Sequence, residues 1–150
     1  CVVRFAELTS TAVVLIGKCP KGLPENVYSY GYLSDHGETA RILNRADAYL
    51  NLSYRDPAPK VVAQGVNCGL PVLYANSGGV PELVTSFGVP VPDHSENVFS
   101  TMTPPLSPIA LVEAYEKLRR NYALLCKEDA ENQSFKDMLR GYFDILSSLI

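Results

Sequence analysis

The sequence predicts an α/β fold in one domain over residues 1–150, a Rossmann-like parallel sheet with flanking helices. Short apolar runs rich in β-branched residues alternate with segments of helical periodicity, and such alternation gives parallel strands with right-handed crossovers. Hydrophobic residues form 47% of the chain, enough for one sizeable core. No apolar run reaches the length of a membrane span.

Five segments have the pattern of strands. The clearest is residues 12–16, a continuous apolar run ended by Gly17, which is typical of a strand buried on both faces. The other strands are predicted at residues 27–32, 48–52, 71–75 and 89–91.

Capping signals place helices between these strands. Asp35 and Glu38 have the spacing of a capping box and predict a helix that runs to Ala46. Pro59 fits the first turn of the next helix, and Gly69 suits a left-handed cap at its end.

The last third predicts two amphipathic helices, which we expect to pack on the sheet or on another domain. Ser107 and Pro108 suit the N-cap and first turn of the first helix. Its apolar face carries Val112, Tyr115, Leu118, Tyr122 and Leu125. The second helix carries Phe135, Leu139, Tyr142, Phe143 and Leu146. Residues 90–105 contain four prolines and are predicted to form a loop.

Charge and cysteine content narrow the function. The net charge is −3 and no basic patch is visible, so nucleic acid is not an expected partner. The four cysteines are scattered without a C-x-x-C pair, so neither a zinc site nor a disulfide framework is predicted. A reduced, cytoplasmic setting and a small-molecule ligand are the expectations that follow.

The segment after the strand at residues 71–75 favours an anion. Gly78 and Gly79 let the backbone approach a ligand closely, and the helix that follows presents free N–H groups. A phosphate or a sugar is therefore expected at this turn.

Linked motifs in this region resemble the C-terminal domain of retaining group 1 family glycosyltransferases, which have the two-domain GT-B architecture. That family places an acid, seven residues, a glutamate, a C-G-x-P-V strand entry and a G-G-x-P-E turn. Asp56 and Gln64 have this spacing, residues 68–72 are C-G-L-P-V, and residues 78–82 are G-G-V-P-E. The resemblance covers most of the chain and is tight over residues 31–84.

The resemblance implies roles for particular residues. Asp56 would be the catalytic-site acid that faces the donor sugar, and position 64 would bind the ribose diol. Gln64 departs from the family glutamate because it keeps an acceptor oxygen but loses the charge. Pro57 and Pro59 lack N–H donors that a glycine-rich stretch would offer.

Further contacts of the donor are implied by the same comparison. Lys60 would place a cation near a phosphate, and the Tyr32–Leu33 backbone would lie beside the base. The phosphate and sugar region would be bound by Gly78, Gly79 and Glu82. The donor would be a UDP-, GDP- or ADP-linked sugar, with no cofactor and no metal. The acceptor would sit on an N-terminal domain outside this chain, and any peripheral membrane contact would be made through that domain.

The first strand of such a domain is expected to lie outside the chain. If residues 1–5 were that strand, about six residues would join it to the next, whereas a parallel crossover needs a dozen or more. Residues 2–8 are therefore predicted to be the end of a helix. In the resemblance, an arginine and a lysine after the missing strand hold the diphosphate.

Other interpretations remain open. Asp56 could be a helix N-cap, Glu82 could serve a helix dipole, Lys60 could be solvated, and the glycine pair could form an ordinary turn. Gln64 and the two prolines also fit a catalytically silent binding or scaffold module. Another GT-B-fold enzyme, such as a nucleotide-sugar epimerase or a glycan phosphorylase, is disfavoured by the motif order.

Overall fold

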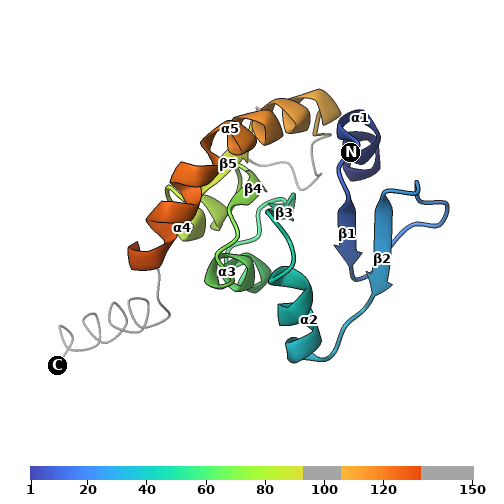
Figure 1. Ribbon diagram of the computed structural model, residues 1–150, viewed down its shortest axis with the longest axis horizontal. Coiled ribbons are helices and arrows are strands. Elements are labelled where there is room, and N and C mark those ends of the chain that lie inside the picture. Colours follow the sequence, from blue (N-terminus) through green and yellow to red (C-terminus); the bar gives the residue numbers. More distant parts are fainter. Residues whose placement is uncertain (93–105, 133–150) are drawn as a thin grey trace.

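The computed structural model describes residues 1–92 and 106–132, which form five helices and five strands (Figure 1). In chain order they are α1 (Val2–Thr9), β1 (Val13–Ile16), β2 (Val27–Gly31), α2 (His36–Leu43), β3 (Tyr49–Asn51), α3 (Lys60–Asn67), β4 (Val72–Ala75), α4 (Val80–Val84), β5 (Gly88–Val91) and α5 (Pro108–Asn132). The mixed α/β fold with parallel strands and flanking helices is confirmed, and each predicted strand is present within one residue or two of its expected limits.

The strands belong to two parallel sheets. β1 pairs with β2, and β4 pairs on its two sides with β3 and β5. Among the described residues, β1 and β3 are not paired with each other. In a doubly wound sheet of order 3-2-1-4-5-6, a sheet without its first strand divides at this place. That a strand outside the chain belongs there stays a prediction.

The three-stranded sheet has helices on both faces. Its strand β4 is buried at all four positions, as expected for a continuous apolar run in a parallel sheet. Leu73 points into the cluster beneath α5, whereas Val72 and Tyr74 point into the cluster beneath α3 and α4. The alternation of side chains along one strand thus supplies both layers.

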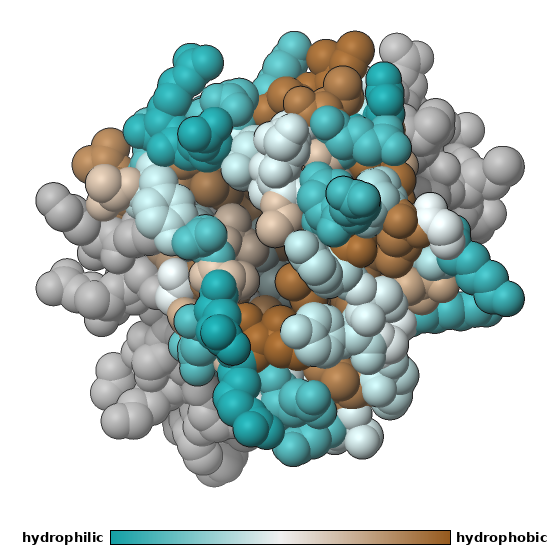
Figure 2. Space-filling view, turned by 45° about the vertical axis from the view of Figure 1, so that its right-hand side comes forward, coloured by the Kyte–Doolittle hydropathy of each residue, from teal (hydrophilic) through white to brown (hydrophobic). Residues whose placement is uncertain are grey.

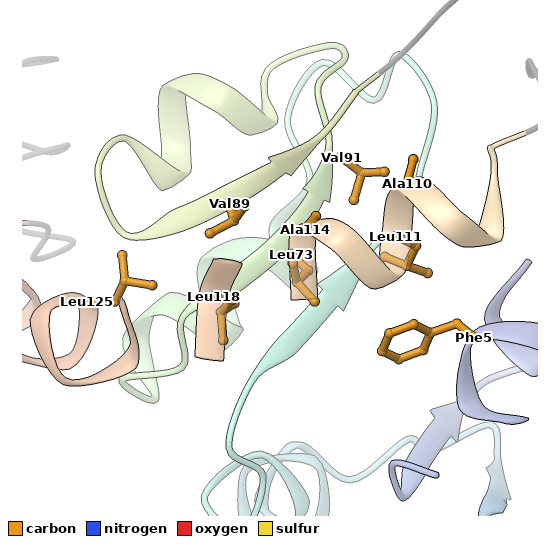
Figure 3. Packing of buried hydrophobic residues seen from close by; sticks show 9 residues of the cluster. All are labelled: Phe5, Leu73, Val89, Val91, Ala110, Leu111, Ala114, Leu118 and Leu125. Carbon is orange, nitrogen blue, oxygen red and sulfur yellow. The ribbon is translucent and has the colours of Figure 1, made fainter. Parts of the chain in front are cut away.

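The cluster beneath α5 is the larger part of the core. Figure 3 shows side chains of α5 pointing onto β4 and β5, with Phe5 of α1 at one end. Its buried members are Phe5, Leu73, Val89, Val91, Ala110, Leu111, Ala114, Leu118 and Leu125. The predicted apolar face of this helix is confirmed at Leu118 and Leu125, while Tyr122 is 37% exposed.

The two-stranded sheet corrects one expectation. Residues 12–16 were expected to form a strand buried on both faces, but Val14 is 44% exposed and Ile16 is 42% exposed. Val13 packs against the core, so this sheet has the core on one face only in the part of the chain that the structure describes. Figure 2 turns the side that bears β1 and β2 forward and shows apolar side chains (brown) among polar ones there.

The helix ends follow the capping signals. The Asp35 side chain accepts a hydrogen bond from the Gly37 N–H at 2.7 Å, as an N-cap should. The helix ends at Leu43 rather than at Ala46, because the last residues of the predicted helix form tighter turns, with the Ala46 N–H bonded to Leu43 O. Gly69 has φ of +74°, which confirms the left-handed cap after α3.

Side chains fasten α1 and the two-stranded sheet to α5. The Asn26 amide donates to Ala6 O at 2.8 Å and to Thr11 O at 2.9 Å. The Thr11 hydroxyl donates to the Tyr115 hydroxyl at 3.1 Å, and the Phe5 and Tyr115 rings meet edge to face at 5.2 Å. The helix predicted over residues 2–8 is confirmed. It contacts Asn26, ahead of β2, and Tyr115 of α5.

Two predictions fall outside the described residues. The second C-terminal amphipathic helix lies entirely within residues 133–150, and most of the loop predicted at 90–105 lies within residues 93–105.

Candidate functional site

The candidate site forms where β3 and β4 end. The loop over residues 52–59 follows β3, and the turn over residues 76–79 follows β4. Because parallel strands present their carboxyl ends at one edge, these two segments are neighbours. Ligands of open α/β sheets bind at this edge.

Two hydrogen bonds join the loop to the turn. The Arg55 N–H donates to the Ser77 hydroxyl at 2.8 Å, and the Gly79 N–H donates to Asp56 O at 2.9 Å. Ser77 is one of two buried polar residues among those described, so its bond to the loop is shielded from water. Asp56, Gly78 and Gly79 are thereby brought together, as the motif spacing predicted.

The glycine pair serves close packing between the two segments. Gly78 has φ of +64°, and a Cβ added there would collide with the Asp56 backbone. A Cβ on Gly79 would collide with the Pro57 carbonyl. The sequence predicted that the glycines let the backbone approach a ligand, but the backbone of the neighbouring loop takes up the space on their Cβ side. Binding of a phosphate by this turn stays a prediction.

Asp56 braces the loop locally. Its Oδ1 accepts a hydrogen bond from the Ala58 N–H at 3.1 Å, and the residue is half-buried. The N-cap residue of α3 is Pro59, so the alternative interpretation of Asp56 as the cap of that helix is wrong. The carboxylate instead stands ahead of the helix, at the loop surface.

Lys60 and Gln64 share one face of α3. Both are exposed, and residues four apart on a helix lie one above the other. Glu82 is exposed in the first turn of α4, where a carboxylate also suits the helix dipole. Since α3 and α4 pack through the shared cluster that includes Val62, Val66, Val80 and Val84, these side chains project from adjacent helices.

The predicted base-binding residues lie on the other sheet. Tyr32 and Leu33 directly follow β2, and Tyr32 is 88% exposed. Gly31 has φ of +68°, which turns the chain at the end of the strand. They stand beyond the division between the sheets, apart from Asp56 and the glycine turn in the strand order.

Tight packing fixes the C-terminal half of α3 against β3. A Cβ on Gly65 would lie 2.8 Å from the Tyr49 ring, so only glycine lets the helix come this close. Burial raises the pKa of the Tyr49 phenol, and its hydrogen bond with the Asn51 side chain acts in the opposite direction. Asn51 is buried at the end of β3 and accepts a hydrogen bond from the Ser53 N–H at 3.1 Å.

The sequence did not predict that Arg55 and Ser77 lie together at this edge of the sheet. Arg55 has φ of +51°, a left-handed conformation that costs a residue with a side chain about 1 to 3 kcal/mol. Its guanidinium lies 5.0 Å from the centroid of the Tyr54 ring. No sequence signal marks an arginine for this conformation, because Gly and Asn are the residues that usually adopt it. Ser77 could have been found only from its place beside the glycine pair.

Two features are absent from the described part of the chain. Within residues 1–92 and 106–132, no three His, Cys, Asp or Glu side chains gather as metal ligands would. Of the helices α1 to α5, none has both the length and the apolar character needed to cross a bilayer.

Comparison with known proteins gives a family match. A family model described as "Glycosyl transferases group 1" matches residues 20–124. The matched range contains the strands and helices from β2 to α4, β5 and most of α5. No match was found among curated proteins.

Proposed function

Because this chain belongs to the group 1 glycosyl transferase family, we propose that it binds a nucleotide-activated sugar and takes part in retaining glycosyl transfer. The observation that supports the proposal is the joining of Asp56 to the glycine turn at the carboxyl ends of β3 and β4. This edge is where an open parallel sheet offers room to a ligand. The acceptor would be held by an N-terminal domain of the same protein.

Each predicted site residue has a proposed task. Asp56 orients the hydroxyls of the donor sugar from the loop. Gln64 binds the ribose diol, and Lys60 brings positive charge to the phosphates from one turn earlier on α3. The phosphate and sugar region is bound by Gly78, Gly79 and Glu82, and the base lies at Tyr32 and Leu33. Positive charge near the leaving diphosphate stabilises the negative charge that develops there, without a metal.

The donor is a UDP-, GDP- or ADP-linked sugar, and thermal unfolding with the three nucleoside diphosphates tests its binding. A ligand at 100 times its dissociation constant adds about 2.7 kcal/mol of stability, which is roughly 5 to 10 °C in Tm for 150 residues. We expect one diphosphate to raise the Tm by that order at millimolar concentration. The Lys60→Gln variant should reduce the shift, whereas Lys117→Gln, an exposed lysine on α5, should not. An unchanged Tm with all three ligands would contradict the proposal.

A second candidate is a catalytically silent binding or scaffold module. Gln64 supports it, because an uncharged amide makes hydrogen bonds to a diol roughly half as strong as those of a carboxylate. Its exposure on α3 makes Gln64→Glu a clean test, since no packing is disturbed. A tenfold or larger gain in diphosphate affinity would indicate a weakened donor site. An unchanged or lower affinity would indicate a site that works with glutamine and would exclude the weakened-site interpretation.

We also propose a cytoplasmic setting. Cys1, Cys19 and Cys68 are free thiols, which fits a reducing compartment. Any contact with a membrane surface would come from the N-terminal domain.

A further inference from the structure

We propose that Arg55 binds the diphosphate of the donor and is held for this task in a strained backbone conformation by the Ser77 hydroxyl. The inference rests on the function proposed above and adds a residue that the motif comparison does not assign.

Position is the first support. The N–H of Arg55 is fixed to Ser77 at 2.8 Å, and the next residue, Asp56, accepts from the Gly79 N–H at 2.9 Å. The backbone of Arg55 is therefore anchored to the turn at which the phosphate is proposed to bind. Two hydrogen bonds therefore fix the distance between the Arg55 backbone and the turn.

The backbone angle is the second support. At φ of +51° a glycine or an asparagine would fold at lower cost than an arginine. Strain of this kind concentrates at ligand-binding positions, where the surrounding structure maintains it. A phosphate contact made by the arginine side chain would offset the strain of its backbone.

Charge is the third support. Residues 52–60 contain two cations, Arg55 and Lys60, and residues 76–79 contain none. A guanidinium can bind two phosphate oxygens at once, whereas an ammonium acts as a point charge. The Tyr54 ring, 5.0 Å from the Arg55 guanidinium, limits the orientations of that side chain before a ligand arrives.

Matched variants test the inference on the whole chain. Arg55→Gln removes the charge, Arg55→Gly also relieves the strain, and Arg119→Gln is the control. Arg119 is a fitting control because its guanidinium also lies over a tyrosine ring, that of Tyr115 at 5.8 Å, but on α5. Affinities for UDP, GDP and ADP, and for the nucleoside of the diphosphate that binds, are measured by calorimetry.

Arg55→Gln and Arg55→Gly should each weaken binding of the diphosphate at least tenfold and leave binding of the nucleoside unchanged. Arg55→Gly should keep the ligand-free Tm or raise it, and Arg119→Gln should bind as the unmodified chain does. Unchanged diphosphate affinity in both Arg55 variants would overturn this inference alone. Equal losses for diphosphate and nucleoside would also overturn it, because they would indicate a structural role. Failure of the unmodified chain to bind any diphosphate would overturn the proposed function as well.

Discussion

At the sheet edge, the space around a residue decides which side chain can be accommodated. Gly79 has an ordinary φ of −86°, so alanine would suit its backbone, yet its Cβ would collide with the Pro57 carbonyl. The requirement for glycine at this position is therefore steric. It comes from a segment more than twenty residues earlier in the sequence.

Gly79→Ala should lower the free energy of unfolding by about 1 to 3 kcal/mol, the usual cost of forcing extra atoms into a packed contact. Urea unfolding measures this loss. Gly37→Ala is the control, since it lies in the exposed first turn of α2, where the nearest atom to an added Cβ is a side-chain oxygen of Asp35 at 3.2 Å. If both variants unfolded at the urea concentration of the unmodified chain, the loop would not be packed on the turn as described.

The residue scale also shows where prediction from sequence stops. The proximity of Asp56 to the glycine pair could be predicted because their spacing is a property of the chain alone. The left-handed φ of Arg55 and its hydrogen bond to Ser77 depend on how two loops pack together. That packing cannot be inferred from the local sequence pattern.

At the scale of elements, apolar pattern decides which helix face is buried. Leu118 of α5 is 1% exposed beneath the helix, whereas Leu124, on the same helix, is 64% exposed. Leu118→Ala should cost about 2 to 5 kcal/mol because it leaves a cavity against β4 and β5. Leu124→Ala should stay within about 0.5 kcal/mol. Chemical denaturation of the two variants compares them directly, and similar losses would contradict the described packing of α5.

Elements were predicted well where the signal is local. The Asp35 cap, the Gly69 stop and the apolar run of β4 each lie within a few residues of what they control. The exposure of Val14 and Ile16 was missed because an apolar run reports the composition of a strand. It does not report whether a second layer covers it.

At the scale of the whole molecule, Asn26 joins three neighbouring segments, which are α1, the residues ahead of β1 and the residues ahead of β2. Its amide satisfies Ala6 O at the end of α1 and Thr11 O ahead of β1. The attachment of the smaller sheet thus depends on a few polar contacts as well as on Phe5.

Asn26→Ala should leave two carbonyls without this donor, and the smaller sheet should then open more readily than the larger one. Amide hydrogen exchange should accelerate for β1 and β2 and stay nearly unchanged for β4. Asn44→Ala, an exposed position after α2, serves as the control. Equal acceleration in all three strands would mean that the molecule opens as one unit.

The division of the strands into two sheets has a consequence for the proposed donor. Its base is proposed to lie at the end of β2 and its phosphates at the ends of β3 and β4. β2 belongs to one sheet, and β3 and β4 belong to the other. A nucleotide that contacts both would bridge two sheets between which the described residues form no inter-strand hydrogen bond. Binding would then make the two sheets unfold more cooperatively, in addition to raising the Tm.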